Sequence, residues 1–270
     1  MRQGLPDSFN PSFIHAFGIL GPSARSAIPE LAEMATNQPE HVSHPAEGGP
    51  HSVRMVGYAP LLALGGVGPE ALPTLSNILT NSTTPGIQLG AIMAIKSMGS
   101  NGRPALPVLL RYVDDHNEMI AFNAIEAVGT VGAHQQLALA ALTTIIQSPR
   151  LELRNTALLA LRDFGEEAAP VLVRALQETS PGAYNIAFTT LVSVTPQTLT
   201  NTAVLAIAAD GLRSPDIDRR TWAAQLLRAA GQQASGEKPD YMVLGGRWDK
   251  VFEDATNALR LLAPELLRQR

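Results

Sequence analysis

Few residues in this chain have the types and spacing that chemistry requires. His41, His44 and His51 share one segment with Glu40 and Glu47. Imidazole and carboxylate groups could bind zinc or nickel if the segment folded around the ion. The segment is rich in proline and glycine and provides no rigid geometry, so a solvated loop is the favoured interpretation.

Other candidate motifs lack the context that their chemistry needs. Residues 66–71 loosely match a dinucleotide-binding pattern, but a helical pattern rather than a strand precedes them. Asp114, Asp115 and Glu118 could supply paired carboxylates for acid–base catalysis, although we expect them to cap a helix. The sequence has no cysteine, no phosphate-binding Gly-Lys-Ser/Thr loop, no His-Glu-x-x-His helix and no Gly-x-Ser-x-Gly elbow. We therefore predict no catalytic residue, metal or cofactor.

Composition limits the classes of partner. The chain has 270 residues, of which 45% are hydrophobic and 16% charged, enough for an extended core. Its formal charge of -4 provides no basic field for nucleic acid. The uncharged stretch over residues 179–209 contains many polar side chains and two prolines, which argues against a membrane span. We predict a soluble chain, with the cytoplasm favoured, that neither binds nucleic acid nor inserts into a membrane.

The candidate residues named above must be positioned by regular structure, and a repeat in the sequence predicts what that structure is. An apolar residue followed by a small turn residue recurs along the chain, and a large apolar residue stands four positions before each turn residue. The turn residues are Gly21, Gly65, Gly99, Gly129, Gly165, Thr195 and Gly231. The residue eight positions before the turn is usually small, so one face of the helix before the turn, called helix A, can approach a neighbour closely.

A second helix, called helix B, is predicted after each turn by recurrent proline and leucine. The loops that return to the next helix A carry a hydroxyl residue followed by proline, which predicts an N-cap and a first helical residue. These pairs are Thr84-Pro85, Ser148-Pro149, Ser180-Pro181 and Ser214-Pro215.

This Ala-Leu-Gly, Pro-x-Ala and Pro-x-Leu cadence resembles short bacterial HEAT repeats, including those of the phycobilisome-lyase-like type, over residues 10–231. The resemblance implies an all-α solenoid, a right-handed superhelix of about seven helix pairs. We expect one solenoid over residues 1–270, with irregular loops at 37–52 and 232–247 and a capping helix over 248–262. HEAT-like di-iron hydroxylases use His-Glu pairs, and no histidine here precedes a glutamate.

In HEAT-like arrays helix B lines the concave wall. Positions opposite the core leucines predict two outward rows. The first row is Glu33, Asn77, Arg111, Ala141, Arg174 and Ile207, and the second is Thr36, Thr80, Asp114, Thr144, Gln177 and Asp210. Either Arg111 or Arg174 could hold an acidic peptide through paired contacts, or both could be merely solvated.

The aromatic residues near the C-terminus add to this surface. Tyr241 and Trp248 could contact a partner or pack the irregular loop, whereas Trp222 is expected in the core. We predict that Arg111, Arg174, Asp114, Tyr241 and Trp248 bind a protein or peptide and that the chain is a non-catalytic scaffold. A bilin-lyase-like or other HEAT-fold enzyme, and a regulatory fragment of a larger protein, remain alternatives.

Overall fold

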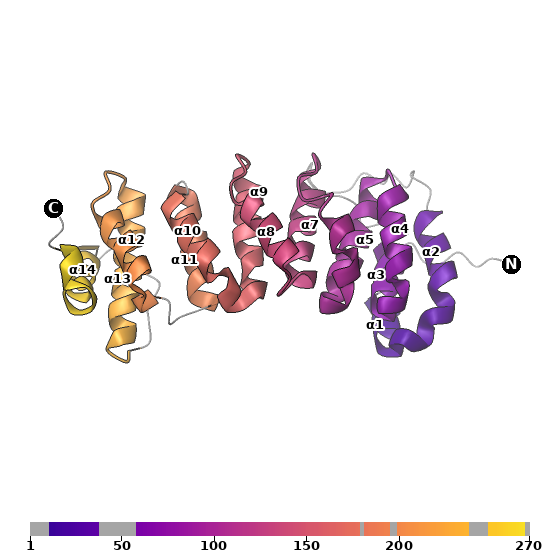
Figure 1. The fold of residues 1–270 in the computed structure, drawn as a ribbon. Coiled ribbons are helices and arrows are strands. Elements are labelled where there is room, and N and C mark those ends of the chain that lie inside the picture. Colours follow the sequence, from indigo (N-terminus) through magenta and orange to yellow (C-terminus); the bar gives the residue numbers. More distant parts are fainter. Residues whose placement is uncertain (1–10, 38–57, 179–180, 195–198, 238–247, 268–270) are drawn as a thin grey trace. The chain divides into compact units, whose positions relative to one another are not determined.

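The computed structural model describes residues 11–37, 58–178, 181–194, 199–237 and 248–267. All regular structure in these residues is helical, which confirms the all-α solenoid class (Figure 1). The chain divides into two compact units, residues 1–141 and 142–270. Each unit is described on its own, and the handedness of the superhelix stays a prediction.

Unit 1 stacks its A helices and its B helices in separate rows. The A helices are α1 (Pro11–Leu20), α3 (Tyr58–Val67), α5 (Pro85–Ser97) and α7 (Glu118–Val131), and each contacts the next. The B helices are α2 (Ile28–Thr36), α4 (Leu72–Asn81) and α6 (Leu106–Leu109), again in contact in that order. The division between the units falls within α8 (Gln136–Ile145).

Unit 2 repeats this arrangement. Its A helices α9 (Leu151–Ala160), α11 (Pro181–Val194) and α13 (Ile217–Ala234) pack in a row, and α10 (Ala169–Glu178) contacts α12 (Thr202–Leu212). The last helix, α14 (Trp248–Leu262), packs along α13. Short 3-10 helices join the members of several pairs, namely η1 (Gly21–Ala27), η2 (Pro69–Ala71), η3 (Gly99–Ala105) and η4 (Leu161–Ala168).

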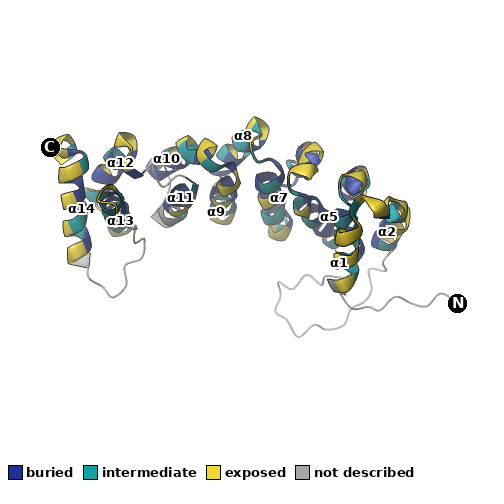
Figure 2. Ribbon diagram, turned by 90° about the horizontal axis from the view of Figure 1, so that it is seen from below, coloured by how far each residue is buried: buried dark blue, intermediate teal, exposed yellow. Residues whose placement is uncertain are grey.

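The core lies between neighbouring helices, where the predicted helix phase places it (Figure 2). Ala121 and Ala124 on α7 are fully buried, whereas Glu126 is exposed and pairs with Lys96 of α5. In unit 2 the ring of Trp222 is 1% exposed and meets Phe188 edge-on at 6.2 Å between centroids. Trp222 is therefore a core residue, as predicted.

The predicted turn glycines have two different structural causes. Gly21, Gly99 and Gly165 have φ angles of 50°, 55° and 56°, in the left-handed region that glycine adopts most easily. Gly65 instead lies inside α3, and Gly129 and Gly231 lie inside α7 and α13.

Close helix packing explains Gly65. A Cβ added there would come within 2.9 Å of the Ala94 carbonyl oxygen and 2.8 Å of the Ser97 hydroxyl on α5. A small residue is required at Gly65 because two helices cross at that point, and the turn does not require it.

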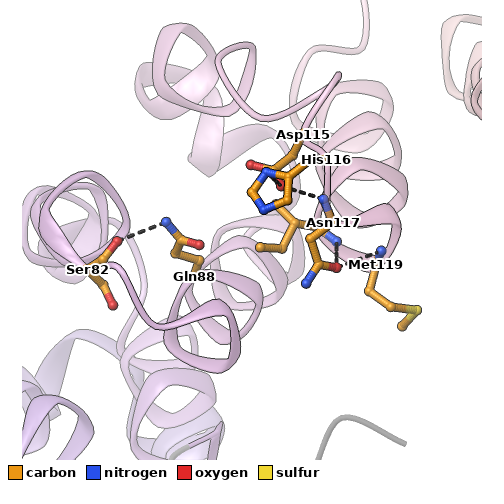
Figure 3. Close-up of polar contacts among 7 residues, drawn as sticks. Ser82, Gln88, Asp115, His116, Asn117 and Met119 are labelled. Carbon is orange, nitrogen blue, oxygen red and sulfur yellow. Dashed lines mark hydrogen bonds and ion pairs between the residues drawn. The ribbon is translucent and has the colours of Figure 1, made fainter. Parts of the chain in front are cut away.

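In three return loops the carbonyl of a serine accepts a hydrogen bond from a side chain six residues later. The capping prediction is right in one of these loops and wrong in the other two. In the loop before α5, the carbonyl of Ser82 accepts from Gln88 Nε2 at 2.8 Å (Figure 3). Thr84 is the N-cap of that helix and Pro85 its first residue, as predicted, although the Thr84 side chain makes no capping hydrogen bond.

Ser148 and Ser214 are not N-caps, contrary to the prediction. Each hydroxyl accepts from the backbone N–H two residues later at 3.2 Å, and each carbonyl accepts from an arginine six residues later, Arg154 at 2.8 Å and Arg220 at 2.7 Å. The helices therefore begin two residues after the prolines, and Asp216 caps α13. A serine hydroxyl can close a local turn instead of capping, because both bonds satisfy a nearby N–H.

Candidate interaction surface

The predicted wall exists in unit 1 as a row of exposed polar side chains on the B side. The leucines used to set the phase, Leu31, Leu75 and Leu109, are 2%, 0% and 0% exposed. The wall side chains opposite them are all exposed, namely Glu33, Thr36, Asn77, Thr80, Arg111 and Asp114. This surface is mixed in charge and built mainly of short side chains.

The short polar residues of the wall bond largely to their own helices. The hydroxyls of Thr36 and Thr80 donate to carbonyls four residues earlier, at 2.9 and 2.8 Å. Asn81 Nδ2 donates to Asn77 Oδ1 at 2.7 Å. Such local bonds hold these short side chains against the helix surface. The longer side chain of Arg111 lies beside them.

Arg111 does not lie on helix B, because α6 ends at Leu109. Its N–H donates to the Val108 carbonyl at 3.1 Å, one of the three-residue bonds that tighten the chain after the helix. Its side chain is exposed and has no ion-pair partner among the residues that the structure describes. A full guanidinium fork is thus available to an external carboxylate.

Tyr112 anchors this turn, and sequence reasoning missed it. Its ring is buried and its hydroxyl donates to the carbonyl of Leu79 in α4 at 2.6 Å. One aromatic residue just after the core leucine was the available signal. The bond ties the turn that carries Arg111 to the preceding repeat.

The acidic residues near Arg111 organise the start of α7. Asp115 Oδ1 accepts from the N–H of Asn117 at 2.8 Å and lies 3.3 Å from His116 Nδ1 (Figure 3). The N-cap is Asn117, whose Oδ1 accepts from the N–H groups of Met119 and Ile120. The expected capping role therefore belongs to this asparagine, while Asp115 shapes the turn before it.

The wall prediction holds less well in unit 2. Arg174 on α10 is exposed, and exposed Asp210 on α12 lies 3.5 Å from Arg219 Nη2. Ile207 was predicted on the wall but is only 6% exposed. The prediction is wrong there because α12 is contacted on several sides, by α10, α13 and the terminal 3-10 helix η6 (Pro264–Leu267).

Several candidates cannot be placed on this surface. Tyr241 lies outside the described residues, as do His41, His44 and His51. Trp248 is the first residue of α14, but its side chain is not described. Arg111 lies in unit 1 and Arg174 in unit 2.

Two further classes of feature are absent from the part of the chain that the structure describes. No group of three or more histidine, aspartate or glutamate side chains there could hold a metal ion. No helix there is long and apolar enough to cross a bilayer.

Comparison with known proteins agrees with this architecture. Residues 72–162 match the family model for HEAT repeats, and no curated protein matches the chain. An engineered protein has a similar structure, with 16% identity, a TM-score of 0.43, and coverage of 96% of this chain and 81% of that one.

Two natural proteins also have similar structures. The complex of CpcE and CpcF of phycocyanin lyase from Nostoc sp. PCC7120 has 16% identity, a TM-score of 0.41, and coverage of 85% of this chain and 98% of that one. Human deoxyhypusine hydroxylase in complex with glycerol has 19% identity, a TM-score of 0.32, and coverage of 93% and 96%. The family match runs from α4 to the start of η4, residues 72–162, and lies within the residues 10–231 whose cadence predicts HEAT repeats.

Proposed function

We propose that the chain is a non-catalytic scaffold that binds an acidic segment of a partner protein on the unit 1 wall. The observation that carries the proposal is the exposed Arg111 guanidinium, which stands at the end of a row of short, locally bonded side chains. Guanidinium groups bind carboxylates through two parallel bonds, which provides both affinity and direction.

Electrostatics favours one acidic group at this position over a highly charged ligand. The same wall carries Glu33 and Asp114, so a strongly acidic polymer would meet repulsion beside its attachment point. A peptide with one or two carboxylates and otherwise small polar side chains fits the wall better. Arg174 is a second exposed arginine, on α10 of unit 2, and is tested together with Arg111.

The test is capture of partners from the native source by the wild-type chain and by the Arg111→Ala, Arg174→Ala double variant. Loss of a bidentate contact to a carboxylate is worth about 1.5–3 kcal/mol, so affinity should fall roughly 10- to 100-fold. The matched control is Arg162→Ala, which removes an exposed arginine from η4, away from the helix B wall. Melting temperatures should stay nearly unchanged in all variants.

Two results would contradict the proposal. One is unchanged capture by the double variant at physiological salt. The other is stoichiometric binding of a tetrapyrrole with transfer to a cysteine-bearing acceptor, which would make the chain an enzyme of the bilin-lyase kind.

A further inference from the structure

The A helices α3, α5 and α7 of unit 1 each have a face that packs against the preceding A helix. On α5 this face contains Ala94 and Ser97, because both lie against the position of a Cβ added to Gly65 of α3. Ala94 and Ser97 stand five and two residues before the turn residue Gly99. These two positions therefore mark the face of an A helix that receives its predecessor.

The same positions of α1 are exposed. Counting back from the turn residue Gly21 gives Ala16 and Ile19. Ile19 is 73% exposed and its neighbour Leu20 is 53% exposed, whereas Ala94 at the place equivalent to Ala16 is fully buried. The outer face of α1 thus has the small and apolar residues of a helix-packing surface without a helix on it in the described residues.

The exposed surface of α14, in unit 2, differs in chemistry. The exposed residues of α14 include a mixture of charges, namely Asp249, Lys250, Glu253 and Arg260. Such a polar outer face is typical of a capping element. The exposed residues of α1 include no aspartate, glutamate, lysine or arginine; they are Ser12, His15, Ala16, Gly18, Ile19 and Leu20.

We propose that the outer face of α1 binds the α1 helix of a second copy of this chain, forming a twofold dimer. The contact would continue the row of A-helix contacts that runs through α1, α3, α5 and α7. A neutral face with a small residue at its centre is self-complementary, because Ala16 lets two helices approach and neither copy buries an unpaired charge. Pairing α1 with α14 of another copy would bury such charges.

The expected dimer is weak. One helix face buries less than the roughly 800 Å² per partner of a standard interface, so a dissociation constant in the micromolar range is expected. This inference does not depend on the proposed function, because it concerns a different surface.

Sedimentation equilibrium of the full chain at rising concentration tests the proposal. The wild type should pass from monomer to dimer, and Ile19→Glu should stay monomeric, because it would bury a carboxylate in the contact. Leu261→Glu is the matched control, since Leu261 on α14 is 64% exposed and should not affect the dimer. Circular dichroism should show the same helical content in both variants.

A cross-link distinguishes the symmetric dimer from other assemblies. The chain has no cysteine, so Ala16→Cys or Ile19→Cys introduces a single thiol. In a twofold contact at least one of these variants should form a disulfide with itself under mild oxidation. A wild type that stays monomeric to high concentration, equal loss of association in Ile19→Glu and Leu261→Glu, or open-ended oligomers would each overturn the proposal.

Discussion

Removal of the Tyr112 hydroxyl should destabilise unit 1 without changing its packing. This hydroxyl donates to the Leu79 carbonyl at 2.6 Å, and the tyrosine is only 9% exposed. Leu79 lies in the last turn of α4, which ends at Asn81, so its carbonyl belongs to the group that has no donor within the helix. Tyr112→Phe keeps the ring and leaves this acceptor without its partner.

The cost follows from burial. Leaving a buried acceptor without a donor lowers the unfolding free energy by about 1–3 kcal/mol, which is more than the net contribution of an average hydrogen bond. With a urea dependence of about 1–3 kcal/mol per molar, the unfolding midpoint should fall by about 1 M. Urea titration followed by far-ultraviolet circular dichroism measures this shift.

Thr80→Val is the matched control. The Thr80 hydroxyl donates to the Ser76 carbonyl at 2.8 Å, but this bond is exposed and lies within one helix. Water can replace it, so the change in unfolding free energy should stay within about 0.5 kcal/mol. Equal shifts for Thr80→Val and Tyr112→Phe, or no shift for Tyr112→Phe, would refute the capping role of the tyrosine.

Two further predictions follow from the packing. Ala121→Leu should overpack the fully buried face of α7 and lower the unfolding free energy by about 1–3 kcal/mol in urea titration. Glu126→Gln, in an exposed ion pair, should lower it by about 0.5 kcal/mol or less, and equal effects would show that the helix phase is wrong. Trp222→Ala should remove the ring that meets Phe188 and cost about 3–5 kcal/mol, seen as a lower melting temperature; an unchanged value would place the ring outside the core.

The amino-acid sequence determined the helix phase and the order of helix pairs. A helix packed against neighbours needs apolar residues every three or four positions, and this spacing can be read from the sequence alone. Ala121, Ala124 and Trp222 are therefore buried where the pattern predicts, and α14 spans the residues expected for a terminal helix. The outward positions of Glu33, Thr36, Asn77 and Thr80 follow from the same phase.

Only the tertiary structure decided which small residues serve turns and which serve packing. Gly99 and Gly65 occupy the same place in the repeat, but one has a positive φ and the other lies against α5. Sequence spacing cannot separate these causes, because a turn and a close helix crossing both select glycine.

Tertiary contacts also decided what surrounds the wall. Ile207 is buried because other helices cover α12, and Arg111 lies beyond α6 in a turn held by Tyr112. Periodicity reports which side of one helix is apolar, whereas exposure and loop geometry depend on residues from neighbouring repeats that no local pattern contains.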